Sequence, residues 1–197
     1  GLAHPLLPIR AVRPQPPRDP RVGHIDELRR RAHMALHSGQ HHLSHAYAEL
    51  FGSETVSSRL GESQCNLDLD AADLEEDQVR EAEARDNDQI DLDRPVRAFF
   101  PSDEELAAME LRYRPKEGHA RIRIVDIGGQ DQTPCGGTHV QRTAQIGLLR
   151  ITTQERYKGG TRLLFSAGPR ARSELLVESR AQRELAQQLS CGLPELP

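Results

Sequence analysis

One long segment with helical periodicity, residues 26–51, is followed only by shorter and more varied segments. Within it, apolar residues including Leu28, Leu36 and Leu43 fall on one helical face, and Gly52 ends the pattern. Short runs that alternate apolar and polar residues come next, without the regular strand–helix alternation of a doubly wound parallel sheet. These patterns predict an α+β fold in which helices pack against a mixed or antiparallel sheet.

The remaining elements are predicted from the same two periodicities. We expect further helices over residues 73–90, 103–112 and 172–189. We expect strands over residues 55–60, 64–70, 96–100, 121–127, 146–151 and 161–166. Asp73 is the expected cap of the second helix, and Ser102 followed by Glu105 is a typical start for the third.

Prolines concentrate at the beginning of the chain. The six prolines within residues 1–22 exclude a helix or a central strand there. The first residue is Gly1, so we expect a fragment of a longer protein. The predicted organisation is a linker or domain remnant over 1–25, a main domain over 26–170, and a truncated helical extension over 171–197.

Charge is distributed unevenly over the 197 residues, whose net charge is −4. Residues 68–93 contain 12 acidic and two basic side chains, a composition typical of a solvated helix. A uniformly basic nucleic-acid-binding protein is therefore excluded. No apolar run is long enough to span a bilayer. Three widely spaced cysteines favour a reducing compartment over a disulfide framework, so we expect a cytoplasmic protein without a membrane segment.

Potential metal ligands gather in two places. The first predicted helix carries four histidines spaced four residues apart on one face: His33, His37, His41 and His45. Any neighbouring pair of them could present two imidazoles to one ion. Cys135 and His139 lie four apart in a glycine-rich segment far along the chain. Two helical imidazoles with this thiol and imidazole make a nitrogen and sulfur donor set that favours Zn²⁺ over Mg²⁺ or Ca²⁺.

A helical histidine pair also occurs in metalloproteases that carry the H-E-x-x-H motif. In those enzymes the glutamate is the general base. Here Ser38 stands at the position of that glutamate, so the sequence argues against a protease.

Two segments resemble a known family. Residues 34–43, MALHSGQHHL, are similar to the H-S/T-x-x-H-L segment of the alanyl-tRNA synthetase editing domain and its freestanding relatives, the AlaX deacylases. Residues 134–140, PCGGTHV, resemble that family's second motif almost letter for letter. The similarity extends over residues 21–170. It implies the second additional domain shared by threonyl and alanyl tRNA synthetases, and it selects His37 and His41 to bind zinc with Cys135 and His139.

The resemblance implies a zinc-dependent trans-editing hydrolase. Its partner would be the acceptor end of tRNA(Ala) carrying a wrong amino acid, chiefly serine and secondarily glycine. A synthetic site built for alanine rejects serine poorly, because one added hydroxyl is weakly excluded by size. A second site that binds this hydroxyl can remove the wrong product.

Hydroxyl groups follow the first helix at the position where the freestanding relatives recognise serine. The resemblance favours Ser58, with Thr55 as a further catalytic-site candidate. Strict alternation places Thr55 and Ser57 on the face opposite Ser58, so only one set would line the pocket. Asp131 is a candidate acid/base or amino-group contact, or else a loop cap. Gln40 is expected to be exposed.

Cations after the Cys135 segment are candidates to bind the acceptor end. We select Arg142, Lys158 and Arg162 for this role. Gly136 and Gly137 would let backbone amides approach phosphate or ribose closely.

Three questions stay open at this point. The chain could instead be a non-catalytic zinc-containing tRNA-binding module, or the editing part of a full alanyl-tRNA synthetase. Family members with an upstream β-barrel carry a glycine-rich loop there that residues 1–25 do not contain, so these residues would be a barrel remnant or a linker. Four protein ligands are typical of structural zinc, and we favour a site that expands to a fifth ligand.

Overall fold

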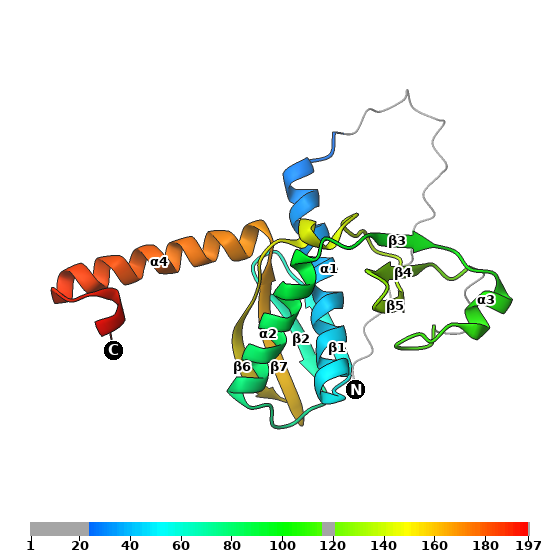
Figure 1. Ribbon diagram of the computed structural model, residues 1–197, viewed down its shortest axis with the longest axis horizontal. Coiled ribbons are helices and arrows are strands. Elements are labelled where there is room, and N and C mark those ends of the chain that lie inside the picture. The colour runs from blue at the N-terminus through cyan, green and yellow to red at the C-terminus, as the bar shows by residue number, and fades with distance from the viewer. Residues whose placement is uncertain (1–23, 116–120, 197) are drawn as a thin grey trace, which may run out of the picture.

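The computed structural model describes residues 24–115 and 121–196, which contain four α-helices and seven strands in two antiparallel sheets (Figure 1). The predicted α+β class with antiparallel sheets is confirmed. The expected linker or barrel remnant lies almost entirely outside the described residues, which begin at His24.

Helix α1 (Glu27–Phe51) is the longest element and has a defined start and end. The carboxylate of Asp26 accepts a hydrogen bond from the backbone N–H of Arg29 at 3.0 Å, which caps the first turn. Gly52 ends the helix in a left-handed conformation with φ of 62°, where glycine avoids the strain that a side chain would bring. These limits agree with the predicted segment 26–51.

The larger sheet has the strand order β1-β2-β7-β6. Its strands are β1 (Thr55–Leu60), β2 (Cys65–Leu69), β6 (Leu149–Tyr157) and β7 (Gly160–Ala167). Helices α1 and α2 (Glu76–Asp91) contact each other and pack against this sheet (Figure 1). The core between them is apolar and includes Leu36, Leu43, Tyr47, Leu67 and Leu163. Burial of these side chains is the main force that holds the helices on the sheet.

A β-bulge changes which residues of β1 face α1. The register pairs Thr55 with Leu69, Ser57 with Asp68 and Ser58 with Leu67. Because directly opposed residues share a face, Thr55 and Ser58 lie on the face of the buried leucines, and Ser57 lies on the outer face. The expectation that Thr55 and Ser57 share a face is therefore wrong. Val56 is the extra residue that interrupts the alternation.

The smaller sheet has the order β3-β4-β5 and includes a strand that was not predicted. Its strands are β3 (Val96–Phe99), β4 (Ile124–Ile127) and β5 (Asp131–Pro134), and α3 (Asp103–Ala108) lies between the first two in sequence. The buried side chains of β5 are the polar ones, Asp131 and Thr133, so the strand lacks apolar alternation. Helix α3 ends at Ala108, four residues before the expected end.

Other boundaries also differ from prediction, and β4 starts at Ile124, three residues after the expected start. Helix α2 is capped by Glu75, two residues after the expected Asp73. A 3₁₀ turn over Thr143–Ile146 occupies the expected start of β6, which instead runs to Tyr157 through exposed polar residues at the sheet edge. Helix α4 (Pro169–Leu189) starts three residues early with proline in its first turn, where the missing N–H is not needed.

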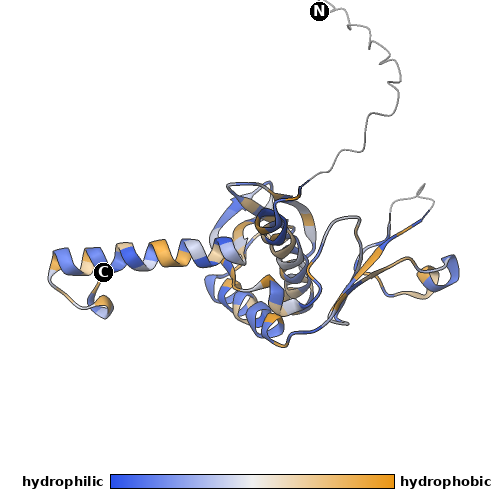
Figure 2. Cartoon of the chain, turned by 90° about the horizontal axis from the view of Figure 1, so that it is seen from above, coloured by the Kyte–Doolittle hydropathy of each residue, from blue (hydrophilic) through white to orange (hydrophobic). Residues whose placement is uncertain are grey.

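Helix α4 extends away from both sheets, as Figures 1 and 2 show from two directions. It carries exposed apolar side chains, among them Leu176 and Val177, between many charged ones. Within the two described ranges, no helix combines the length and apolar character needed to cross a membrane.

An ion pair joins β2 to β7 on the outer face of the larger sheet. Arg162 donates two hydrogen bonds to Asp68, with Nε–Oδ1 at 2.7 Å and Nη2–Oδ2 at 2.9 Å. The Ser57 hydroxyl also donates to Asp68, and the guanidinium of Arg162 lies 3.4 Å from the ring centroid of Tyr157. The hydrogen bonds from Arg162 lower the pKa of Asp68 to about 2.

We expect this pair to make folding stability depend on pH in the acid range. The pKa of Asp68 is about 2 in the folded protein and about 3.9 in an unfolded chain. The stabilisation is therefore fully present above about pH 4 and is lost as the pH falls towards 2. Urea unfolding of the Asp68→Asn variant should lose this part of the acid dependence. An unchanged pH profile in that variant would contradict the role of the pair.

Candidate metal and substrate site

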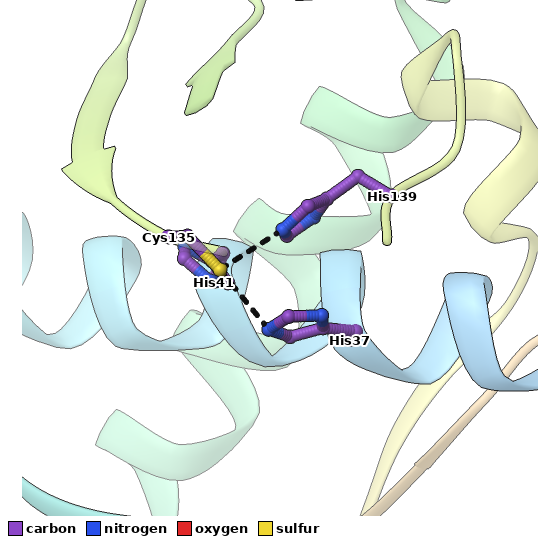
Figure 3. Close-up of side chains that lie close together, drawn as sticks. All are labelled: His37, His41, Cys135 and His139. Carbon is purple, nitrogen blue, oxygen red and sulfur yellow. Dashed lines mark hydrogen bonds between the residues drawn. The ribbon is translucent and has the colours of Figure 1, made fainter. Parts of the chain in front are cut away.

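Four side chains from two distant parts of the chain converge at one point (Figure 3). His37 and His41 come from α1, and Cys135 and His139 come from the loop that follows β5. Their potential ligand atoms all lie within 4.8 Å of one another. Sγ of Cys135 is 3.5 Å from Nε2 of His37 and 3.3 Å from Nε2 of His139. The structure thus brings together the four residues expected as ligands, in a group compatible with a metal ion.

Each imidazole is oriented by a contact at its other nitrogen. The partners of Nδ1 are the Thr138 carbonyl oxygen for His37 at 3.2 Å, the Thr133 hydroxyl for His41 at 2.9 Å, and the Ser38 hydroxyl for His139 at 3.1 Å. With Nδ1 occupied, each ring has Nε2 available for the common point. Partners of this kind fix the tautomer and the ring direction of metal-binding histidines.

The loop packs directly against the ring of His37 at Gly137, which has no side chain. A Cβ atom built on Gly137 would lie 2.1 Å from Cε1 of His37, which is far inside contact distance. A Cβ on Gly136 would meet no atom within 4 Å. The two glycines, predicted together as tRNA contacts, therefore differ: Gly137 is packed against a ring of the site, and Gly136 faces open space.

The thiol of Cys135 sits in a setting that favours its thiolate form. Burial raises the pKa of this thiol, but hydrogen bonds with His139, His37 and His41 outweigh burial and lower the pKa to about 3. The backbone N–H of Gly137 also donates to Sγ at 3.4 Å. Metal ions bind cysteine as thiolate, so this environment prepares the sulfur for coordination.

Arg123 fixes the path of the same loop. Its Nη1 donates to the carbonyl oxygens of Cys135 and Gly137, each at 2.8 Å. These two bonds hold the backbone on both sides of Gly136, so Arg123 positions the thiol without lying among the four ligands.

Asp131 lies on the Nδ1 side of the His41 ring. Its carboxylate is 3% exposed, accepts two hydrogen bonds from Arg112 at 2.9 and 3.1 Å, and lies 3.8 Å from Nδ1 of His41. Burial raises the pKa of Asp131, but His41 and Arg112 together lower it. The carboxylate is therefore ionised at neutral pH, and both of its oxygens are engaged. This geometry favours a positioning role for Asp131 over the expected acid/base role.

The other histidines of α1 lie outside the group of four. His42 is buried with Nδ1 3.8 Å from Oδ1 of Asp86, a pair between α1 and α2. His45 lies 3.7 Å from Glu49 one turn along the helix, and His33 is half-buried near the helix start.

A small cavity of about 270 Å³ borders His41. Its wall includes Gln40, Ser44, Thr55, Ser57 and Ser58. The hydroxyl of Ser44 accepts hydrogen bonds from Nε2 of Gln40 and from the hydroxyl of Thr55, both at 2.8 Å. Gln40 is only 8% exposed, so the expectation of an exposed glutamine is wrong. The cavity therefore presents a fixed set of polar groups beside one potential ligand.

The cations expected to bind tRNA do not gather around this site. Lys158 and Arg162 line a separate cavity on the outer face of the larger sheet, where Arg162 is held by Asp68. Arg142 pairs with Asp93, with Nε 2.7 Å from Oδ2. Their role in tRNA binding stays a prediction.

Four supporting residues were not predicted from the sequence: Ser38, Arg112, Arg123 and Thr133. Ser38 stands inside the H-S-x-x-H segment, and its position beside a ligand is the signal that could have identified it. Asp131 and Thr133 are two residues apart and share the buried face of β5. This pattern is informative only once the strand is recognised. Nothing in the sequence near Arg112 indicates its pairing with Asp131.

Comparison with known proteins identifies relatives. Residues 122–164 match the family described as threonyl and alanyl tRNA synthetase second additional domain. The chain is similar to alanyl-tRNA editing protein Aarsd1 of Rattus norvegicus, with 32% identity over 171 residues, 85% of this chain and 42% of that protein. It is 31% identical to alanyl-tRNA editing protein AlaX-L of Pyrococcus horikoshii over 155 residues, 77% of this chain and 38% of that protein.

A longer relative matches as well. The chain is 31% identical over 181 residues to an alanine–tRNA ligase of Methylacidiphilum infernorum, which covers 88% of this chain and 19% of the ligase. The chain thus spans less than half the length of each of these proteins. Residues 122–164 therefore match the threonyl and alanyl tRNA synthetase second additional domain, and the resemblance of the chain to the alanyl-tRNA editing proteins is confirmed.

Proposed function

We propose that this chain is a zinc-dependent deacylase that hydrolyses Ser-tRNA(Ala), and more weakly Gly-tRNA(Ala). The observation that carries the proposal is the convergence of His37, His41, Cys135 and His139 beside a small polar cavity. The names of the similar proteins supply the substrate class. We further propose that residues 26–170 form the editing domain and 171–197 a helical extension. The cytoplasmic location stays a prediction.

Two donor separations in the group of four support zinc as the ion. Tetrahedral zinc with bonds of about 2.3 Å to sulfur and about 2.05 Å to nitrogen separates those two atoms by about 3.6 Å. The separations of 3.5 and 3.3 Å between Sγ of Cys135 and the two Nε2 atoms are close to this value. The three imidazoles and one thiolate also exclude hard cations such as Mg²⁺ as the preferred ion.

Side chains around the site would orient the zinc ligands and bind the acyl group of the substrate. When bound, zinc supplies Lewis-acid polarisation of a water molecule or an ester carbonyl. Ser38, Thr133 and the Thr138 carbonyl hold the rings in place, and Asp131 holds a negative charge behind His41. The cavity beside His41 then determines which acyl group can reach the site.

The cavity can select serine by its hydroxyl. Because Thr55 donates its proton to Ser44, its oxygen remains an acceptor towards the cavity. Ser58 lies on the same face of β1 and offers a second hydroxyl. A buried hydrogen bond that only the wrong amino acid can make discriminates far better than size.

A second candidate is a tRNA-binding module in which zinc is purely structural. The four protein ligands favour it, since catalytic zinc sites usually keep one position open. The two candidates differ in one measurement, the release of serine from mischarged tRNA by the zinc-loaded protein.

The Cys135→Ala variant should lose both zinc and activity. Even partners outside the ligand set change metal affinity by about 10–100-fold, so we expect at least about a hundredfold weaker binding here. Zinc content and the hydrolysis of Ser-tRNA(Ala) are measured together, with Cys191→Ala as the control. Full hydrolysis by the metal-free variant would contradict zinc dependence. Zinc binding without hydrolysis by the unaltered chain would favour the structural module.

The two neighbouring glycines give a matched test of the loop packing. In Gly137→Ala the new methyl group displaces the ring of His37, so zinc affinity should fall by about 10–100-fold. In Gly136→Ala the methyl group enters open space, and affinity should stay unchanged. A chelator competition titration measures both. Equal affinities for the two variants would show that the close contact is unimportant.

The neighbouring serines of β1 test selectivity. Ser58→Ala should lower kcat/KM for Ser-tRNA(Ala) by about tenfold, the value of one hydrogen bond of ordinary strength. Ser57 also borders the cavity, but its hydroxyl proton is donated to Asp68 on the outer face of the sheet, so Ser57→Ala should have the smaller effect. Steady-state hydrolysis of Ser- and Gly-tRNA(Ala) gives the comparison. If Ser57→Ala proves the more damaging of the two, the assignment of faces fails.

A further inference from the structure

A second, larger hollow borders the cluster on the side of Cys135. We call it the arginine groove and define it by Phe100, Tyr113, Arg114, Arg121, Arg123 and Cys135. Its volume is about 620 Å³, within the usual range for ligand sites. Residues from the end of β3, from the approach to β4 and from the end of β5 meet there, so the smaller sheet and its connections form its wall.

The described part of the groove wall is positively charged. Three arginines line it, and no carboxylate is found among the described residues that form its wall. Arg123 is engaged with the loop carbonyls. Arg114 and Arg121 lie in exposed positions, and Arg114 makes one long hydrogen bond, to the carbonyl oxygen of Leu106 at 3.4 Å. The cavity on the outer face of the larger sheet differs, because Asp68 and Asp70 line it together with its cations. An anionic ligand is therefore favoured in the arginine groove.

The groove also offers aromatic faces. Phe100 and Tyr113 are 51% and 47% exposed, which is unusual for such large side chains. The guanidinium of Arg121 lies 4.5 Å from the ring centroid of Phe100. The Tyr113 hydroxyl donates to the carbonyl oxygen of Pro134 at 2.9 Å, which holds the ring in place. Aromatic rings beside arginines are the typical means of binding unpaired nucleotides, through base stacking and phosphate contacts.

The groove connects with both parts of the proposed active site. Cys135 lines the groove and is one of the four clustered residues. Tyr113 lines the groove and also the small cavity beside His41. A nucleotide in the groove can therefore place its ribose at the cluster while the acyl group occupies the small cavity.

We propose that the arginine groove binds the unpaired 3′-terminal nucleotides of the tRNA, with Phe100 as a stacking platform and Arg121 and Arg114 as phosphate contacts. The identity of this RNA rests on the proposed function. The binding surface itself rests on the charge, the aromatic faces and the continuity with Cys135.

The test compares two RNA probes on the zinc-loaded full chain. One is uncharged tRNA(Ala), and the other is the same tRNA without its three unpaired terminal nucleotides. We expect the intact tRNA to bind about tenfold more tightly, and Arg121→Gln or Phe100→Leu to remove that difference. Arg121→Gln should also lower the slope of log affinity against log salt by about 0.7, one phosphate contact on a single strand. Arg180→Gln, an exposed arginine on α4, is the control and should change neither.

The outcomes separate the groove from the reaction. Zinc content of every variant should equal that of the unaltered chain, which shows that the fold and the cluster are intact. If the chain hydrolyses Ser-tRNA(Ala) but the groove variants keep the full preference for the intact tRNA end, the groove proposal is overturned and the function stands. If the preference is lost in those variants but the unaltered chain hydrolyses nothing, the groove stands and the function fails. The groove proposal would also be overturned if Arg180→Gln lost the preference for the intact tRNA end to the same extent. It would likewise be overturned if polyglutamate competed for the groove as well as the intact tRNA does.

Discussion

The site depends on a direct contact between a loop and a helix. The backbone at Gly137 lies against the ring of His37 with no space for even a methyl group, and this contact brings Cys135 and His139 over α1. Two hydrogen bonds from Arg123 hold the same loop from the other side. Fixation of the loop at these points therefore adds to the hydrogen bonds that Cys135 makes with His37 and His139.

Helix α1 links the two sheets through this contact. Its apolar face packs with β1 and β7 of the larger sheet, and it also contacts β5 of the smaller one. The two potential metal ligands on α1, His37 and His41, consequently lie where the two sheets approach the same helix. The small cavity is bounded by β1 of the larger sheet and by Arg112 and Tyr113, which lie in the connection between α3 and β4.

The sequence was most informative where one residue type carries the chemistry. The four-residue spacing of the histidines and the PCGGTHV segment indicated a cluster, and the family resemblance then selected His37 and His41 from the four histidines. The bulge at Val56 could not be foreseen, since no composition marks an extra residue in a strand. Strand β5 was not predicted because its buried side chains are polar. The role of Arg112 was not predicted because its partner, Asp131, is distant in the chain.

The bulge in β1 allows the hydroxyls of the cavity to change independently of the four clustered residues. The groups proposed to hold the ion come from α1 and the loop, whereas the hydroxyls of Thr55 and Ser58 owe their common orientation to one irregular residue in an edge strand. Under the proposed function, selection of the acyl group and binding of the ion are thus encoded in separate stretches of backbone. One property can change over evolution, or by engineering, while the other is conserved.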